Sequence, residues 1–196
     1  GAVAPLLPFE TENISLNNTL RYYLDIGIDP KKTILALPYY GSMWEGTLSE
    51  DGSTSSMFER KVTYREIRSL FNEDFVTRNK LSPVLEKKSM TNYFNINYPD
   101  NTSKEVWFDD DYTLGKKYDF ALTNKLKGIG IWALGYDNGY NDLWDVIENK
   151  FATDELKVVD PVGQIEGYPI KVSSYILEKR DLLLVTSLFF LFAVAI

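Results

Sequence analysis

Cysteine and histidine are both absent from the 196 residues of this chain. The absence of cysteine excludes disulfides, thiolate metal sites and a cysteine nucleophile, although it does not decide the compartment. The absence of histidine excludes a Ser-His-Asp triad and histidine-based metal sites within the chain. Proton chemistry must therefore come from carboxylates, from tyrosines or from a substrate, and we expect neither a metal nor a cofactor.

Positive charge is also scarce, because 21 Lys and Arg stand against 28 Asp and Glu, which gives a net charge of -7. The sequence shows no basic stripe, so nucleic acid is not an expected partner. Aromatic residues are plentiful at 14%, with 13 Tyr and 4 Trp. The hydrophobic fraction of 44% suits a globular domain with a sizeable core.

Residues 128–137 are the most informative stretch (GIGIWALGYD), an apolar run that ends on the carboxylate of Asp137. A run that is apolar on both faces predicts a strand buried on both sides, as in a parallel sheet. Its glycines allow neighbouring backbone or a ligand to approach closely. Trp132 is too large, and too polar at its N–H, to be ordinary filler in such a strand. An aromatic platform with a carboxylate at the end of a parallel strand is what a sugar-binding barrel needs.

A helix, a turn and a second buried strand come earlier in the chain. Apolar residues at helical spacing predict a helix from a Ser15 cap to about Ile26, followed by a turn at 29–32. Residues 33–41 then read as a buried strand that ends in aromatics. This order is the repeating unit of an α/β barrel or a doubly wound sheet.

The stretch between the two strands predicts a small subdomain. Residues 42–62 are polar and rich in Gly, Ser and Thr, which predicts a long loop, and Thr63 is expected to cap a short helix through Phe71. Strand-like patches follow at 91–96 and 105–108. Because the stretch is too long for a barrel loop, we predict an α+β insertion subdomain over about residues 42–108, at the carboxyl face of the barrel.

Two further helices are predicted around the strand at 128–137. Thr113 is expected to cap a helix to about Leu126, and Asn141 to cap a last helix whose apolar face carries Trp144 as a core residue. The run 109–111 (DDD) lacks the spacing of an EF-hand loop. We therefore interpret it as a solvated turn plus charge at a helix N-terminus, and not as a metal site.

The C-terminal residues divide into two segments. Residues 152–181 are mixed in polarity and are interpreted as a linker or juxtamembrane segment. Residues 182–196 carry no charge and fall short of the roughly 20 residues that span a bilayer, but the run has not ended at Ile196. We expect the start of a transmembrane helix; the alternative is a hydrophobic core segment. Since Gly1 replaces an initiator Met, both ends look cut, and we expect a piece of a longer protein.

Four blocks together resemble the C-terminal part of family 18 glycoside hydrolases, the chitinase family. Residues 1–6 (GAVAPL) are similar to the loop after the sixth barrel strand, and residues 34–41 (ILALPYYG) to the seventh strand. Residues 105–114 (EVWFDDDYTL), with Lys117, are similar to the exit from the family's insertion domain. Residues 128–137 (GIGIWALGYD) are similar to the eighth strand. Their order and spacing cover residues 1–151 and leave 152–196 unmatched. The implied fold is α/β, the C-terminal portion of a TIM (β/α)8 barrel with a small α+β insertion subdomain.

The resemblance also implies a reaction. The family cleaves β-1,4 linkages at N-acetylglucosamine in chitin-like or peptidoglycan-like glycans by substrate-assisted retention, in which the sugar's own N-acetyl oxygen attacks the anomeric carbon. This chemistry needs no histidine, cysteine or metal. The glutamate that donates the proton lies on the family's fourth strand, and nothing in this chain matches it. We therefore expect substrate-binding walls and no catalytic residue here, and an inactive chain when alone.

Two places at strand ends supply the first candidate contacts with the glycan. The resemblance places Trp132 as the floor of the cleavage subsite, where an indole presents a flat partner to a sugar face; the alternative is a core Trp. Tyr39 and Tyr40 end the strand at 33–41, where one side chain points to the lumen and the other to the helices. Either is a candidate for the cleft, and the alternative is that both only pack.

Four more residues are candidates on weaker grounds. Trp107 and Asp109 sit where the family's insertion domain contributes a cleft wall, although they also fit a subdomain core and a turn. Trp44 follows the strand at 33–41 and is a candidate outer sugar platform. Asp137 is a candidate for orienting a hydroxyl or a lumen tyrosine, or for bracing the turn between strand and helix.

Two other classes of function fit the same sequence. A family member that has lost its acid would be a non-catalytic, lectin-like glycan-binding surface protein on the same fold. A structural or signalling ectodomain around the membrane segment is a third class. For the hydrolase and for the lectin-like protein we expect a glycan partner. We expect the protein to be anchored in the membrane and exposed at the cell surface or another extracytoplasmic side.

Overall fold

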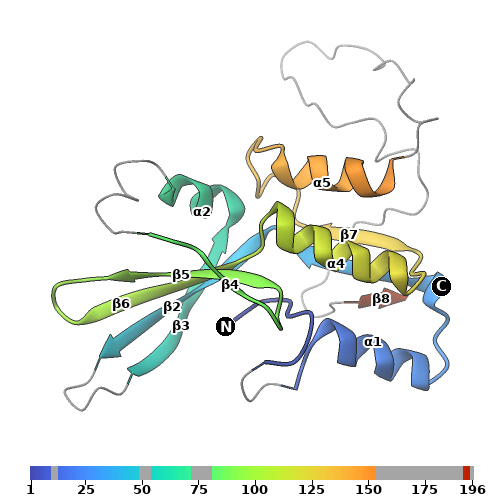
Figure 1. Cartoon of the computed structure of the whole chain (residues 1–196), viewed down its shortest axis with the longest axis horizontal. Helices are drawn as coiled ribbons and strands as arrows, with labels where there is room; N and C mark the ends of the chain where they lie inside the picture. The colour runs from blue at the N-terminus through green and yellow to red at the C-terminus, as the bar shows by residue number, and fades with distance from the viewer. Residues whose placement is uncertain (10–12, 49–53, 72–80, 153–191, 195–196) are drawn as a thin grey trace, which may run out of the picture.

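The computed structural model describes residues 1–9, 13–48, 54–71, 81–152 and 192–194, and all structural statements below refer to these residues. Helices and strands are arranged as Figure 1 shows. The elements are α1 (Leu16–Asp25), the 3-10 helix η1 (Pro30–Lys32), β1 (Thr33–Pro38), β2 (Tyr40–Leu48), β3 (Thr54–Thr63), α2 (Tyr64–Leu70), β4 (Val84–Glu86), β5 (Thr91–Asn97), β6 (Thr102–Phe108), α4 (Asp111–Thr123), β7 (Gly128–Trp132), α5 (Asp142–Phe151) and β8 (Phe192–Val194).

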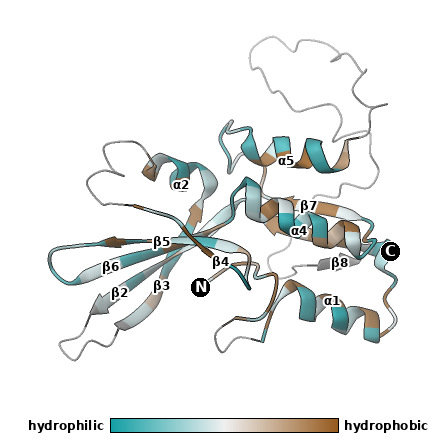
Figure 2. Cartoon of the chain, in the orientation of Figure 1, coloured by the Kyte–Doolittle hydropathy of each residue, from teal (hydrophilic) through white to brown (hydrophobic). Residues whose placement is uncertain are grey.

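Strands β1 and β7 form the parallel pair that the two buried runs predict. The register runs from Ile34 opposite Gly128 to Pro38 opposite Trp132. One face of the pair is packed with α1, α4 and α5 into a single core, whose fully or nearly buried members include Leu16, Leu20, Leu35, Leu37, Leu114, Ile129, Ile131 and Leu143. Figure 2 shows the apolar residues concentrated on β7 and mixed with polar ones along α4 and α5, as expected of helices that cover a sheet. The predicted fold class is confirmed.

The helix starts follow the sequence with one correction. The Ser15 hydroxyl accepts from the Asn18 N–H at 3.2 Å, which caps α1 as predicted. Thr63 caps α2 in a box with Glu66, also as predicted. The cap of α4, however, is Asp110 and not Thr113. Its carboxylate accepts from the Thr113 N–H, and the Thr113 hydroxyl accepts from the Asp110 N–H, both at 2.9 Å, so Thr113 is the returning partner of a capping box.

Strand boundaries are corrected at both predicted strands. The strand expected over 33–41 ends at Pro38, and Tyr40 already belongs to β2 of another sheet. The strand expected over 128–137 ends at Trp132, so Asp137 lies in the following loop. Asn141 does precede α5, but its side chain makes no capping hydrogen bond.

The loop predicted over 42–62 is wrong, because β2 and β3 pair there as an antiparallel hairpin from Tyr40–Thr63 to Leu48–Thr54. Residues 55–61 of β3 are exposed, so this strand is held by hairpin pairing and shows no buried apolar alternation that a sequence pattern would reveal. The whole second sheet has the order β3-β2-β6-β5-β4. In Figure 1 it extends away from the parallel pair together with α2.

The C-terminal run is described only at residues 192–194. They form β8, which pairs antiparallel with β1 at Leu35 opposite Phe192, so these three residues are strand and not the expected helix. Residues 153–191 and 195–196 lie outside the described residues. Within the described ranges, no helix has the length and apolar character needed to cross a membrane.

Candidate functional site

Trp132 ends β7 at the carboxyl edge of the parallel pair. It is partly exposed, and its carbonyl accepts from the Tyr39 N–H at 2.7 Å, which extends the pairing by one residue. Ile129 and Ile131 face the helices, so the alternation of a strand directs Trp132 to the opposite face. The Trp132–Ala133 peptide is cis. Because Trp132 is the last residue of β7, strand alternation puts its indole on the side away from the helices, at the edge where the active sites of α/β barrels are found.

The loop after Trp132 is braced by its own polar contacts. Asp137 is buried and accepts from the Trp144 indole N–H at 2.8 Å. Trp144 packs against the core, as predicted, with its ring edge-on to Tyr39 at 5.8 Å between centroids. In this structure Asp137 therefore holds the loop after β7 to α5 through Trp144.

Tyr39 is a core residue in this structure, with an exposed fraction of 1%. Its hydroxyl donates to the Leu143 carbonyl at 3.3 Å. Burial raises the pKa of the Tyr39 phenol far above its ordinary value, and the neighbouring Tyr118 adds to the shift. Tyr39 thus offers no ring face to solvent, whereas Tyr40, the next residue, is partly exposed.

The second sheet has two different faces. Alternation places Met43, Val62, Phe94, Ile96, Val106 and Phe108 on one face, where they form a core with Ile67 of α2. The register places a different set together on the other face, which we call the aromatic face: Tyr40, Ser42, Trp44, Phe58, Lys61, Tyr93, Glu105 and Trp107. Three of the predicted site residues (Tyr40, Trp44 and Trp107) are therefore on one surface, which begins next to the end of β1.

The aromatic face is open at some positions and closed at others. Trp107 is only 4% exposed, because it stacks on Tyr93 at 4.7 Å and is covered by Phe9 at 5.4 Å between centroids. Its indole N–H donates to Glu105. Trp44 is partly exposed beside Phe58, and its indole N–H donates to the Ser42 hydroxyl at 3.1 Å. Trp44 and Tyr40 are therefore accessible to solvent, whereas Trp107 is a buried packing residue between Tyr93 and Phe9.

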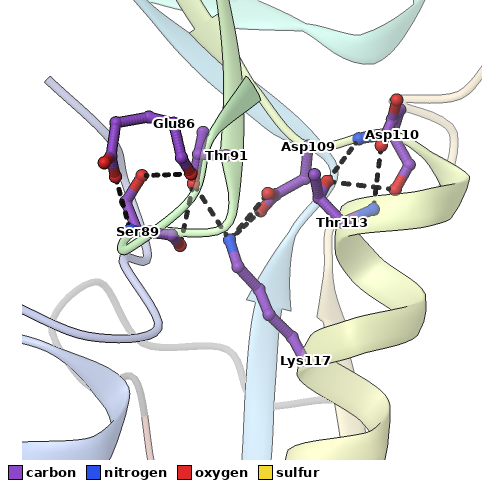
Figure 3. A network of polar contacts seen from close by, with 7 residues as sticks. All are labelled: Glu86, Ser89, Thr91, Asp109, Asp110, Thr113 and Lys117. Carbon is purple, nitrogen blue, oxygen red and sulfur yellow. Dashed lines mark hydrogen bonds and ion pairs between the residues drawn. The ribbon is translucent and has the colours of Figure 1, made fainter. Parts of the chain in front are cut away.

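Asp109 is buried in an ion pair, which corrects the expectation of a solvated turn at 109–111. Figure 3 shows Lys117 reaching from α4 to Asp109 and to Thr91, at the start of β5. The Lys117 ammonium lies 2.6 and 2.7 Å from the two Asp109 oxygens and 3.3 Å from the Thr91 hydroxyl. Burial raises the pKa of the Asp109 carboxyl and lowers the pKa of Lys117, and their mutual attraction opposes both shifts. The ion pair between Asp109 and Lys117 therefore connects α4, which covers the parallel pair, to the antiparallel sheet at the residue that follows β6.

A second junction fixes α2 to the loop after Trp132 and to α5. The Arg65 N–H donates to the Tyr136 carbonyl at 2.8 Å. Arg68 and the Tyr64 hydroxyl both donate to Asp142, and the Arg68 guanidinium lies 4.8 Å from the centroid of the Tyr140 ring. Sequence reasoning missed these residues because Arg68 and Asp142 are 74 positions apart and no motif links them.

The parallel pair, its helices and the inserted antiparallel sheet define a chain of the (β/α) barrel class, and solved structures share this fold. A family 18 chitinase from Cycas revoluta in complex with (GlcNAc)4 superposes with a TM-score of 0.58 at 16% identity, over 76% of this chain and 42% of that chain. The sequence family described as glycosyl hydrolases family 18 matches residues 1–137, and the chain belongs to this family.

Two curated proteins that are similar to this chain are named as a glycosylase and a chitobiase. The chain is 29% identical over 120 residues to an uncharacterized glycosylase, YvbX, of Bacillus subtilis (strain 168), a match that covers 61% of this chain and 31% of that protein. It is 26% identical over 163 residues to di-N-acetylchitobiase of Homo sapiens, with 70% of this chain and 41% of that protein covered. The chain thus spans less than half the length of either relative.

Proposed function

We propose that the whole protein is a glycoside hydrolase that cleaves β-1,4 linkages at N-acetylglucosamine in chitin-like or peptidoglycan-like glycans. Family membership and the relatives named as a glycosylase and a chitobiase support the class of reaction. The observation that carries the proposal is the Trp132 indole, partly exposed at the carboxyl edge of a parallel strand pair. The mechanism proposed is substrate-assisted retention, which fits a chain without histidine or cysteine.

In this proposal the chain supplies the glycan-binding walls and the rest of the protein supplies the proton donor. Trp132 is the floor on which one pyranose rests, because stacking removes the apolar C–H face of the sugar from water. Tyr40 and Trp44 extend the wall along the aromatic face. The other four candidates are buried, and in this proposal they hold the wall in position without contacting the glycan: Tyr39, Trp107, Asp109 and Asp137.

The proposal is tested by hydrolysis of a chitin tetrasaccharide. The whole protein should release shorter oligosaccharides with the β-anomer predominating at early times, as retention requires. The 196-residue chain alone should show no turnover of the same substrate, because it lacks the acid. Release of the α-anomer, or turnover by the chain alone, would contradict the proposed division of roles. Binding without turnover by the whole protein would instead assign the lectin-like function.

We also propose that the whole protein is anchored in a membrane and exposed on an extracytoplasmic side. The support is the uncharged run over residues 182–196, of which 192–194 pair with β1 as β8 and would leave that pairing in the anchored protein. Fractionation of source cells tests this proposal: the protein should sediment with membranes, resist extraction with carbonate at high pH and be released by detergent. Recovery in the soluble fraction would overturn the anchoring.

A further inference from the structure

Lys61 is the one cationic residue that the register places on the aromatic face. In the hairpin it lies opposite Ser42, while its neighbour Thr63 lies opposite Tyr40, so Lys61 and Tyr40 are diagonal neighbours on one face. The Lys61 ammonium is 4.5 Å from the centroid of the Tyr40 ring and 3.4 Å from the Tyr40 hydroxyl. Tyr40 in turn contacts Tyr136, in the loop that follows Trp132, at 6.3 Å between ring centroids. The cation therefore lies beside the proposed glycan site.

The charge of Lys61 is not neutralised by a carboxylate among the described residues, whereas three other basic side chains of α2 and the antiparallel sheet are ion-paired. Arg60 pairs with Glu66, Arg68 with Asp142, and Lys104 with Glu59. The side chain of Lys61 contacts the ring and the hydroxyl of Tyr40.

Within the part of the chain that the structure describes, Lys61 is thus a cation without a carboxylate partner, in a chain of net charge -7. The carboxylate on the same face belongs to Glu105, which accepts from the Trp107 indole N–H and lies opposite Trp44 in the register. The two ends of the aromatic face therefore differ in charge. The Lys61 ammonium lies beside Tyr40, and Glu105 lies opposite Trp44.

We propose that Lys61 and the Tyr40 hydroxyl bind a carboxylate carried by the glycan. The two donors are 3.4 Å apart, a spacing that the two oxygens of one carboxylate can span. A hydrogen bond between an ammonium and a carboxylate is shorter and stronger than one between neutral groups. This inference rests on the proposed function and names its substrate: a glycan in which N-acetylglucosamine is linked to an amino sugar that bears a carboxylate, in preference to neutral chitin.

Two tetrasaccharides of equal length test the inference in the whole protein: a neutral N-acetylglucosamine tetramer and a peptide-free tetramer that alternates N-acetylglucosamine with N-acetylmuramic acid. The measured quantity is kcat/KM for each, or Kd if neither is cleaved. We expect the wild type to prefer the anionic tetramer. Lys61→Gln should lower kcat/KM for the anionic tetramer by about threefold to tenfold and leave the neutral one unchanged, since an exposed ion pair is worth only a modest factor.

Two controls make the result specific. Lys32→Gln removes one positive charge at η1. Because η1 precedes β1, Lys32 lies at the end of that strand opposite to Tyr40, so kcat/KM for both tetramers should stay unchanged. Tyr40→Phe keeps the ring and removes the hydroxyl, and it should lower kcat/KM more for the anionic tetramer than for the neutral one. Added salt should reduce the wild-type preference, because screening shortens the reach of an exposed charge.

The outcomes separate this inference from the proposed function. If wild type handles both tetramers but Lys61→Gln affects them equally or not at all, the carboxylate site is overturned and the hydrolase proposal stands. If wild type neither binds nor cleaves either tetramer, the proposed function fails and this inference fails with it. Retained preference in Lys61→Arg, which keeps the charge, supports the electrostatic origin, and its loss overturns it.

Discussion

The ammonium of Lys117 lies between the two carboxylate oxygens of Asp109, at 2.6 and 2.7 Å, and both side chains are buried. The pair joins α4, which covers the parallel sheet, to the residue that follows β6 in the antiparallel sheet. The Thr91 hydroxyl, at the start of β5, accepts a third contact from Lys117. A buried pair of this kind is weak evidence for stability, but removing one partner leaves an uncompensated charge.

Lys117→Met should therefore destabilise the whole protein strongly, by about 3–5 kcal/mol near neutral pH. The double variant Lys117→Met with Asp109→Asn removes both charges and should recover much of the loss, because no buried charge is left unpaired. Denaturation midpoints of the three proteins provide the measurement. Equal destabilisation in the single and double variants would show that packing, and not charge, explains the loss.

The pH dependence of Lys117→Met gives a second check on the same pair. Burial already raises the pKa of Asp109, and losing the cation raises it further, above the value of about 4 in the unfolded chain. The folded state then binds the proton more tightly than the unfolded state, so the penalty is present at neutral pH and shrinks as pH falls through the folded pKa. Relative to the double variant, the single variant should regain stability on acidification; a constant difference across pH would exclude this origin.

The sequence predicts those strands and helix starts that depend on local chemistry and on the periodicity of apolar residues. The two buried apolar runs predict β1 and β7, and Ser15 and Thr63 predict the starts of α1 and α2. These signals are short-range, because a cap hydroxyl and an apolar spacing are read within a few residues.

The sequence fails where pairing across distance decides the structure. The hairpin β2–β3 is exposed along much of β3, so nothing in 42–62 distinguishes strand from loop until the partner strand is known. The burial of Trp107 depends on Phe9 and Tyr93, and that of Asp109 on Lys117. The aromatic face itself emerges only from the register of four paired strands, which explains why Lys61 carried no signal in the sequence.

Two glycines should respond to alanine in opposite directions. A Cβ at Gly41 would lie 2.1 Å from the Trp107 carbonyl oxygen, so Gly41→Ala must displace β6 and should cost about 1–3 kcal/mol or more. At Gly115, inside α4, a Cβ would meet Val146 and Lys150 at 3.7 and 3.8 Å, which is ordinary contact. Gly115→Ala should stabilise by about 0.5–1 kcal/mol. Thermal melts of both variants provide the measurement, and destabilisation by Gly115→Ala would contradict the packing described between α4 and α5.

The cap of α4 is tested by two neighbouring aspartates. Asp110→Ala removes the carboxylate that accepts from the Thr113 N–H and should cost about 1 kcal/mol. Asp111→Ala removes a charge in the first turn, which is exposed, and should cost a few tenths of a kcal/mol at most. Chemical denaturation distinguishes the two variants, and an equal effect would show that charge at the helix end, and not the cap, is what matters.

Arg68 should act on the glycan site through the loop after Trp132. It pairs with Asp142 and lies against Tyr140, so Arg68→Gln loosens the contact between α2 and that loop. We expect a several-fold rise in KM for a chitin tetrasaccharide with a smaller change in kcat. Arg60→Gln, which breaks the exposed pair with Glu66, is the matched control and should change neither. A loss of stability without a change in KM would reduce Arg68 to a structural role.

The proposed function depends most on Trp132 as the surface on which a sugar rests. The direct measurement is the affinity of the whole protein for a chitin tetrasaccharide, compared between wild type, Trp132→Ala and Tyr22→Ala, an exposed aromatic on α1 that is 61% accessible. Trp132→Ala should weaken binding by about tenfold or more, because a stacked aromatic contributes apolar burial as well as geometry. Tyr22→Ala should leave the affinity unchanged. Unaltered affinity in a folded Trp132→Ala protein would contradict the account.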